Sequence, residues 1–319
     1  MNFTPPLQLN EQTLEALHSS GHLLVGVSGG RDSIALITLL SKLANCYPIV
    51  CHVNHSLRPE ADDEEIFVKN YAHHLGLPFV SKKIDVTTYA KEHKLATEEA
   101  ARILRQDLFF HWAREFNTNI VALAHHRNDQ AETALLHLCR GSSGIRAMTP
   151  VSLWANGLTV IRPLLNQSRS DITAWLSSQN IPWVDDASND SSDYTRNALR
   201  HQILPQLDSI FARDVSITLT RSANLAHVSR TALTQALEHL NLLDPQGRLY
   251  LPTVMTFPAE LRQAAIHWFL KNQNIPELSE EVVQRVLDIL PPTGASRVSL
   301  PGGYLAIRKE KRLFVKKLL

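Results

Sequence analysis

The residues with the clearest chemical potential form one short segment near the start of the chain: Ser28, Gly29, Gly30, Arg31, Asp32 and Ser33. An apolar run, 22–27, precedes this segment, and an apolar-periodic stretch, 34–43, follows it, so the segment joins a predicted strand to a predicted helix. Such a turn directs backbone N–H groups and the positive end of a helix dipole at one anionic point. The glycines let the main chain approach an anion, and the serine hydroxyls add donors. The segment therefore predicts a phosphate-binding loop.

This loop lacks the Gly-Lys-Ser/Thr ending that holds the β- and γ-phosphates when a terminal phosphoryl group is transferred. Its Ser-Gly-Gly-x-Asp-Ser form instead resembles the PP-loop of ATP pyrophosphatases, which hold the leaving pyrophosphate while an acceptor attacks the α-phosphorus. The resemblance implies ATP as substrate and transfer of AMP. An ordinary glycine-rich turn is the alternative interpretation, which the coincidence of motif, strand and helix disfavours.

A second group combines one histidine with two carboxylates: His125, Asp129 and Glu132. Their i, i+4, i+7 spacing places them on one stripe of a helix that opens after the predicted strand 120–124. Carboxylates and a histidine in a crevice can bind an amine and help to deprotonate it. The alternative is a solvated helix start in which the two acidic residues complement the helix dipole.

Two further groups combine charges on predicted helices. Glu98, Arg102 and Arg105 have helical spacing, for which a salt-bridged helix surface is the alternative to a site. Arg196 and Arg200 share a face by their i, i+4 spacing. This spacing suits binding of phosphate or nucleic acid, and it equally suits pairing with acidic residues of the preceding loop, namely Asp185, Asp186 and Asp193.

Histidines and lysines elsewhere suggest weaker sites. His52 and His55 have no carboxylate or cysteine partner at ligand spacing, so we predict no dedicated metal site, and expect magnesium to arrive with ATP. The basic runs 308–312 and 316–317 lie on predicted strands near the C-terminus. They indicate either a sheet edge protected by lysines or a surface that binds the phosphates of tRNA.

The elements that position these groups alternate between strand and helix. Strand-like runs at 22–27, 49–53, 78–84 and 120–124 are separated by helical stretches at 62–75 and 97–116. This alternation predicts an α/β fold with a Rossmann-like parallel sheet covered by helices on both faces. Ligands of such sheets bind at the carboxyl ends of the strands, where the phosphate loop, the segment His52 to His55, and His125 with His126 would face one crevice. The polar stretch 185–193 is expected to be a loop or lid beside it.

The length of 319 residues and the apolar content of 44% predict two domains. We place a catalytic domain at 1–210, a helical linker at 211–242 and a smaller α+β domain, expected to bind tRNA, at 243–319. The three cysteines form no Cys-x-x-Cys pair, and no apolar run approaches the roughly 18 residues that span a bilayer. A cytoplasmic protein without membrane contact is therefore expected. The net charge of +1 restricts nucleic-acid binding to local patches.

Several motifs match one family in order. They are 28–33, His52 to Arg58, Glu98 with Ala101 and Arg102, His125 to Thr133, Arg140-Gly141, Arg162 to Leu165, and Asp186 to Asn189 with Arg196 and Asn197. The chain thereby resembles tRNA(Ile)-lysidine synthetases, strongly over its first two thirds and more weakly beyond, as a short form. The resemblance implies that ATP activates C2 of the wobble cytidine in an isoleucine tRNA with a CAU anticodon. The ε-amine of L-lysine then displaces AMP to give lysidine, and decoding shifts from AUG to AUA.

The resemblance also implies roles for individual residues. The loop 28–33 would hold ATP, with Asp32 as a candidate magnesium contact, and Arg102, His125, Asp129 and Glu132 would surround the lysine and the base. Two residues depart from the family pattern: Asn128 stands where Asp is usual, and Gln106 where an aromatic residue is common. A cytidine-thiolating enzyme and a catalytically silent tRNA- or nucleotide-binding module are the alternative functions. A homodimer is compatible with this prediction but not required by it.

Overall fold

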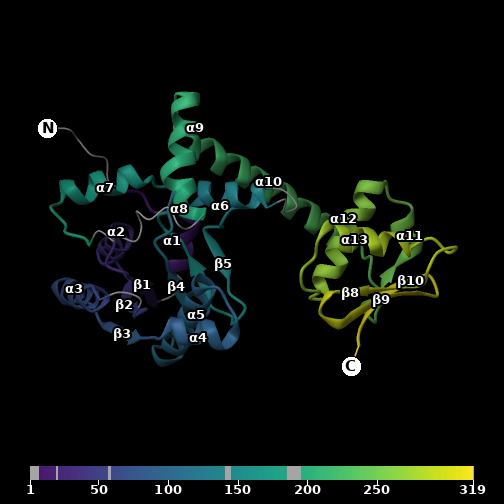
Figure 1. Ribbon diagram of the computed structural model, residues 1–319, viewed down its shortest axis with the longest axis horizontal. Helices are drawn as coiled ribbons and strands as arrows, with labels where there is room; N and C mark the ends of the chain where they lie inside the picture. The colour runs from purple at the N-terminus through teal and green to yellow at the C-terminus, as the bar shows by residue number, and fades with distance from the viewer. Residues whose placement is uncertain (1–6, 19–20, 57–58, 141–144, 185–194, 319) are drawn as a thin grey trace. The chain divides into compact units, whose positions relative to one another are not determined.

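The computed structural model describes residues 7–18, 21–56, 59–140, 145–184 and 195–318 (Figure 1). The chain forms two compact units, the first made of 1–136 and 147–221 and the second of 137–146 and 222–319. The predicted linker, 211–242, coincides largely with the long helix α10 (Val215–His239), and the division between the units falls inside this helix. The predicted boundaries at 210 and 242 therefore lie on either side of the observed division.

The first unit contains a six-stranded sheet in the order β3-β2-β1-β4-β6-β5. Its strands are β1 (His22–Gly26), β2 (Tyr47–Asn54), β3 (Phe79–Lys83), β4 (Ile120–Ala122), β5 (Val151–Leu153) and β6 (Thr159–Ile161). The first four and β6 pair in parallel, which confirms the predicted Rossmann-like architecture. The chain extends the sheet in one direction through β3 and then returns to the other side of β1. The loops after β1 and β4 thus meet at a topological switch point.

The edge strand β5 differs from the prediction of a purely parallel sheet, because it pairs antiparallel with β6. The connection between them is a tight turn in which Trp154 N–H donates to Leu158 O (2.8 Å) and Gly157 has a positive φ of 87°. Two strands joined by so short a turn can pair only in an antiparallel direction.

Helices cover both faces of this sheet, and β1 is therefore buried on both sides. Leu23 and Val25 pack with α2 (Arg31–Leu40), α3 (Ala61–His74) and α7 (Arg169–Ser178), whereas Leu24 packs on the other face with α5 (Thr97–Glu115). Near the first face lies α1 (Glu11–His18), and α4 (Val86–His93) packs on α5. The remaining helices of this unit are α6 (Arg127–Cys139), which continues into the second unit, α8 (Thr195–Ala198), the π-helix η2 (Leu199–Ile203) and α9 (Leu204–Phe211). None of the described helices combines the length and apolar character that a membrane crossing requires.

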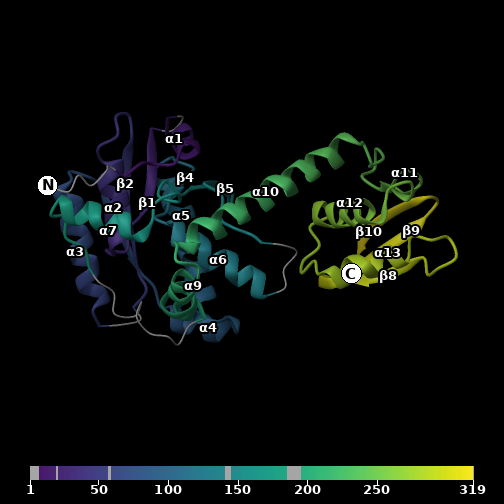
Figure 2. The same cartoon turned by 90° about the horizontal axis from the view of Figure 1, so that it is seen from above.

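The second unit is built on an antiparallel sheet in the order β7-β10-β9-β8. Its elements are β7 (Leu249–Tyr250), α11 (Leu251–Met255), α12 (Ala259–Asn272), α13 (Glu280–Asp288), β8 (Arg297–Leu300), the short η3 (Pro301–Gly303), β9 (Tyr304–Lys309) and β10 (Arg312–Lys317). Figure 2 shows α12 and α13 beside this sheet, and Phe269, Val286 and Leu313 are fully buried between them. The unit thus has its own core and is the smaller α+β unit that the sequence predicts.

Candidate functional site

The loop after β1 has the backbone geometry of a phosphate cradle. Val27 N–H donates to Cys51 O (3.0 Å), so pairing with β2 continues for one residue beyond β1. Gly29 then adopts a φ of 96°, which L side chains rarely adopt, and an added Cβ would lie 3.3 Å from Val68 Cγ2. Gly30 begins α2 without a side-chain cap, so the first-turn amide groups of this helix have no side-chain acceptor. An anion is the natural partner for such groups.

The two serines of the loop have different roles. Ser33 is buried, and its Oγ donates to Gly30 O (2.8 Å) while accepting from Ser28 N–H (3.2 Å). Ser28 is exposed, and its Oγ accepts from Gly30 N–H at 3.4 Å. The hydroxyl of Ser33 therefore holds the loop in shape, and that of Ser28 is the one open to a ligand.

Asp32, in the first turn of α2, contacts a buried histidine from the loop after β4. Its Oδ2 lies 3.5 Å from His126 Nε2, and its Oδ1 accepts from Arg31 Nε at 3.2 Å. Burial raises the pKa of Asp32, but the hydrogen bond and charge of His126, together with Arg31, outweigh burial and lower the pKa to about 2. Asp32 is therefore a carboxylate at neutral pH, beside the phosphate loop.

His126 links this carboxylate to a second one. Its Nε2 lies 3.7 Å from Asp129 Oδ2, and its backbone N–H donates to the same oxygen at 2.9 Å. Burial disfavours the imidazolium, yet Asp129 and Asp32 favour it more strongly, so the pKa of His126 is raised. The sequence predicted that His126 faces the crevice beside His125 but gave it no role in the site. Its i, i+3 spacing to Asp129 was the available signal.

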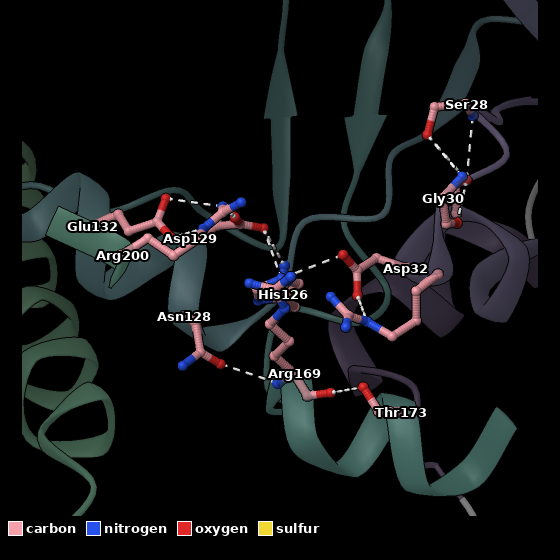
Figure 3. Close-up of polar contacts among 12 residues, drawn as sticks. Ser28, Gly30, Asp32, His126, Asn128, Asp129, Glu132, Arg169, Thr173 and Arg200 are labelled. Carbon is pink, nitrogen blue, oxygen red and sulfur yellow. Dashed lines mark hydrogen bonds and ion pairs between the residues drawn. The ribbon is translucent and has the colours of Figure 1, made fainter. Parts of the chain in front are cut away.

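Asp129 and Glu132 on α6 are paired with arginines from the segment after residue 194. Arg200 Nε donates to Glu132 Oε1 (2.6 Å) and Arg200 Nη2 to Asp129 Oδ1 (3.0 Å). Arg196 Nε donates to Glu132 Oε2 (3.0 Å), and its Nη2 donates to Thr133 Oγ1 (3.2 Å). Figure 3 shows Glu132, Arg200, Asp129, His126 and Asp32 as a continuous row of contacts. The acidic stripe predicted from sequence thus forms, with Glu132 fully buried.

The partners that the sequence suggests for Arg196 and Arg200 are outside the described residues. Asp185, Asp186 and Asp193 belong to 185–194, as does the predicted lid. Among the described residues the two arginines pair with Asp129 and Glu132. A contact of either arginine with tRNA stays a prediction.

His125 lies in the loop between β4 and α6, in a cationic environment, and not on the helix where the sequence predicted it, because α6 begins only at Arg127. Burial lowers its pKa to about 4, since the attraction of Asp129 is offset by Arg162, Arg105 and Arg196. Its Nδ1 is buried and has no hydrogen-bond partner among the described residues. The imidazole is therefore neutral at pH 7 and able to accept a hydrogen bond.

Of the two arginines on α5, Arg105 rather than Arg102 lies near these histidines. Arg102 is half exposed and contacts Glu99 at 3.7 Å. Arg105 is partly buried, and its buried Nε has no hydrogen-bond partner among the described residues. Its charge lowers the pKa values of both His55 and His125. The predicted place of Arg102 in the pocket remains untested, and Arg105 is a stronger candidate for an anion contact.

Asn128 turns away from the acidic row. Its Oδ1 accepts from Arg169 N–H (3.0 Å) at the start of α7 (Figure 3). An aspartate could accept the same bond, so this departure from the family pattern leaves the local geometry intact. Burial lowers the pKa of Arg169, and the nearby Arg31 and Arg200 lower it further. Three guanidinium groups therefore gather close to Asp32.

The histidine after β2 has a structural role. His52 Nδ1 bonds to Val27 O (2.8 Å), which fixes the start of the phosphate loop. Among the residues that the structure describes, no cluster of three or more His, Cys, Asp or Glu side chains could hold a metal ion.

The basic C-terminal run divides into structural and exposed residues. Arg308 Nε donates to Ile289 O (2.6 Å), and Arg312 Nε donates to Asp244 Oδ2 (2.7 Å). Lys309, Lys311 and Lys316 are exposed. The exposed lysines are therefore the residues that could protect the sheet edge or bind phosphate, and both interpretations of this run stay predictions.

Comparison with known proteins places the phosphate loop in a wider context. A family model described as a PP-loop domain matches residues 6–207. A tRNA(Ile)-lysidine synthase from Parabacteroides distasonis is 36% identical over 92% of this chain and 68% of its own length. One from Chlorobaculum tepidum is 32% identical over 97% of this chain and 98% of its own. One from Thermosipho africanus is 42% identical over 59% of this chain and 44% of its own.

The fold also resembles a solved structure. The U34-tRNA thiolase NcsA from Methanococcus maripaludis, determined with its [4Fe-4S] cluster, matches with a TM-score of 0.51. The match covers 64% of this chain and 71% of that one at 14% identity. A likeness at this identity concerns the fold alone.

Proposed function

Because the chain belongs to the PP-loop family of tRNA(Ile)-lysidine synthases, we propose that it joins L-lysine to the wobble cytidine of a CAU-anticodon isoleucine tRNA. The O2 oxygen of cytidine attacks the α-phosphorus of ATP, and pyrophosphate leaves. The ε-amine of lysine then attacks C2, a C–N bond forms, the C2–O bond breaks and AMP leaves. The product carries lysine at C2 and changes decoding from AUG to AUA.

One observation carries this proposal: the phosphate loop and a buried acidic pair lie on neighbouring strand ends and are joined through His126. Adenylation needs the first and recognition of an ammonium group needs the second. Their closeness within one unit supports the proposal that both steps occur at one site, as a transfer through an adenylated base requires.

For the first step, the loop 28–33 is assigned to the departing pyrophosphate. The open amides of α2 and the Ser28 hydroxyl supply donors, and Arg31 and Arg169 supply positive charge. Asp32 fits the oxygen preference of magnesium, because it is an ionised and partly exposed carboxylate beside the loop. Magnesium would arrive with the nucleotide.

For the second step, Asp129 and Glu132 are assigned to the ε-ammonium group of lysine. Its ordinary pKa of about 10.4 means that it must lose a proton before it attacks. His125, neutral at pH 7, is suited to accept a hydrogen bond from the amine, but its lowered pKa makes it too weak a base to hold the proton. The partly buried Arg105 is suited to the charge on the α-phosphate, whereas the sequence placed Arg102 among the groups around the lysine and the base.

The tRNA requires a larger surface than this pocket. The exposed lysines of β9 and β10 and their connection are the proposed phosphate contacts of the second unit, since phosphate contacts position a nucleic acid without reading its sequence. A homodimer is retained as a proposal about assembly.

The test is direct. The chain is incubated with ATP, magnesium, radiolabelled lysine and a transcript of CAU-anticodon isoleucine tRNA. Label should enter the tRNA only with ATP, and one pyrophosphate should be released for each lysine incorporated. Binding of tRNA without incorporation would indicate a silent module and contradict the proposal.

Thiolation of cytidine is not favoured by the cysteines. Cys51 is buried, and burial raises the pKa of its thiol, while burial also raises the pKa of Cys46 to about 11. Neither thiol is activated for sulfur transfer. Cys139 is exposed at the end of α6, in the segment that belongs to the second unit.

A further inference from the structure

The acidic pair assigned to lysine is already occupied by arginines. Both oxygens of Glu132 accept bonds from guanidinium groups, one from Arg200 at 2.6 Å and one from Arg196 at 3.0 Å. Asp129 divides its oxygens between Arg200 and the backbone of His126. A lysine ammonium group entering this site would need the same lone pairs, so lysine and the two arginines compete for one pair of carboxylates.

The arginines also have another anion to bind. Arg200 lies close enough to Arg169 and Asp32 for their charges to interact, and Arg169 also interacts with Arg31. Four arginines, namely Arg31, Arg169, Arg196 and Arg200, face three carboxylates, Asp32, Asp129 and Glu132, and the buried His126 adds a further positive charge when protonated. Counted over the described residues, this surplus of positive charge lies beside the phosphate loop, where a nucleotide brings negative charge.

The backbone that carries Arg200 is unusual. Leu199–Ile203 forms a π-helix between the α-helical turns of α8 and α9. A π-helical turn holds one more residue than an α-helical turn and is rare outside functional sites. Conversion of this turn to α-helix would rotate the preceding residues, Arg196 among them, by about one residue, or about 100°, relative to α9. The segment therefore has a second backbone arrangement within reach that separates the arginines from Glu132.

We propose that Arg196 and Arg200 form a latch that keeps lysine out of the acidic pair until a nucleotide occupies the phosphate loop. The inference rests on the proposed function and adds an order of binding to it. In the closed state the arginines neutralise Asp129 and Glu132. The phosphates of ATP attract the arginines, and the carboxylates become free for the ammonium group. Lysine then enters a site in which the electrophile is present or about to form.

The latch predicts that the affinity for lysine depends on nucleotide. Calorimetric titration of the full chain with L-lysine, without nucleotide and with α,β-methylene-ATP and magnesium, measures this dependence, because the methylene bridge prevents loss of pyrophosphate. We expect the Kd for lysine to fall at least tenfold when the analogue is bound.

Direct attraction between the phosphates and lysine would also lower this Kd, so a variant must separate the two causes. In Arg200→Gln the carboxylates are partly open from the start, and the analogue should change the Kd less than twofold. Arg114→Gln, at the far end of α5 from the acidic row, is the matched control and should retain the full effect. Circular dichroism establishes that each variant is folded.

The possible outcomes distinguish failure of the latch from failure of the proposed function. Equal lysine affinity with and without the analogue in the wild-type chain would overturn the latch, and this measurement needs no variant. A tenfold effect that persists in folded Arg200→Gln would also overturn it, since direct attraction would then be the cause. If lysine binds neither with nor without the analogue, and no labelled lysine enters tRNA in the product assay, the proposed function and the latch are both wrong.

Discussion

The lowered pKa of His125 leads to a quantitative prediction about acid pH. Burial, with repulsion from nearby arginines, lowers its pKa from 6.5 to about 4. Between these values the unfolded chain binds the proton and the folded chain does not, so the free energy of unfolding falls as the pH falls through this window. Integration from pH 7 to pH 5 gives a loss of about 2 kcal/mol from this one residue. Such a loss is a substantial part of the stability of a domain.

The comparison that isolates this contribution is wild type against His125→Gln, which does not titrate. The difference in the free energy of unfolding, wild type minus variant, should decrease by about 2 kcal/mol from pH 7 to pH 5. His55, whose pKa burial also lowers to about 4, cancels in this difference because both proteins contain it. A difference that stays constant across this range would refute the assignment of His125 as a neutral, buried imidazole.

The assay must report on the first unit alone. Four of the five tryptophans lie in that unit, at 112, 154, 175 and 183, and the fifth is Trp268 in the second. With Trp268→Phe in both proteins, fluorescence during urea unfolding follows the unit that contains His125. The slope of free energy against urea concentration should agree between the two proteins, because a change in slope would indicate a different unfolded or folded state.

Three further predictions concern the loop and its neighbour. His126 has a raised pKa in the folded chain, so its charge stabilises the fold fully below pH 6.5. The difference in the free energy of unfolding between wild type and His126→Gln should therefore shrink as the pH rises through the folded pKa. Urea unfolding at several pH values measures this difference. Gly29→Ala places a Cβ at a φ of 96° and against Val68. We expect the free energy of unfolding to fall by about 1–2 kcal/mol and most ATP–pyrophosphate exchange activity to be lost. Normal exchange activity in this variant would exclude the cradle geometry. Asp32→Asn should slow adenylation about 100-fold while the Kd for tRNA changes less than about twofold; equal turnover in variant and wild type would remove Asp32 from the reaction.

The sequence predicted the elements and the loop because these depend on local pattern. Residues 28–33 combine a strand end, glycines and a helix start, and each of these features has a local signature. The strand β5 was not predicted as an antiparallel edge, because its direction depends on the turn before β6 rather than on the strand itself. On α5 the sequence could not choose between Arg102 and Arg105. They lie three residues apart on one side of the helix, and the direction of the pocket decides which is more buried.

The partners of Glu132 could not be predicted for a related reason. Arg196 and Arg200 follow it by 64 and 68 residues, and no periodic pattern connects positions so far apart. The sequence placed acidic residues nearer to the arginines in the chain, in 185–193, and proximity in sequence made those the natural partners. A parallel sheet instead brings together groups that are distant in the chain, at the strand ends where the ligands are expected.

The ion-pair network around Glu132 is also an argument for function, because its contribution to the stability of the fold does not explain why a buried carboxylate is present. Removing a carboxylate from water is costly, and replacing a buried ion pair by apolar side chains of similar volume is often neutral or stabilising. Glu132 is fully buried, yet it lies at the edge of a core in which Ala131 and Leu135 of the same helix pack with Leu204. An apolar replacement would have to include Arg196 and Arg200, because removal of Glu132 alone leaves both without their partner. Under the proposed function, binding of the lysine ammonium group gives this carboxylate a use that stability alone does not.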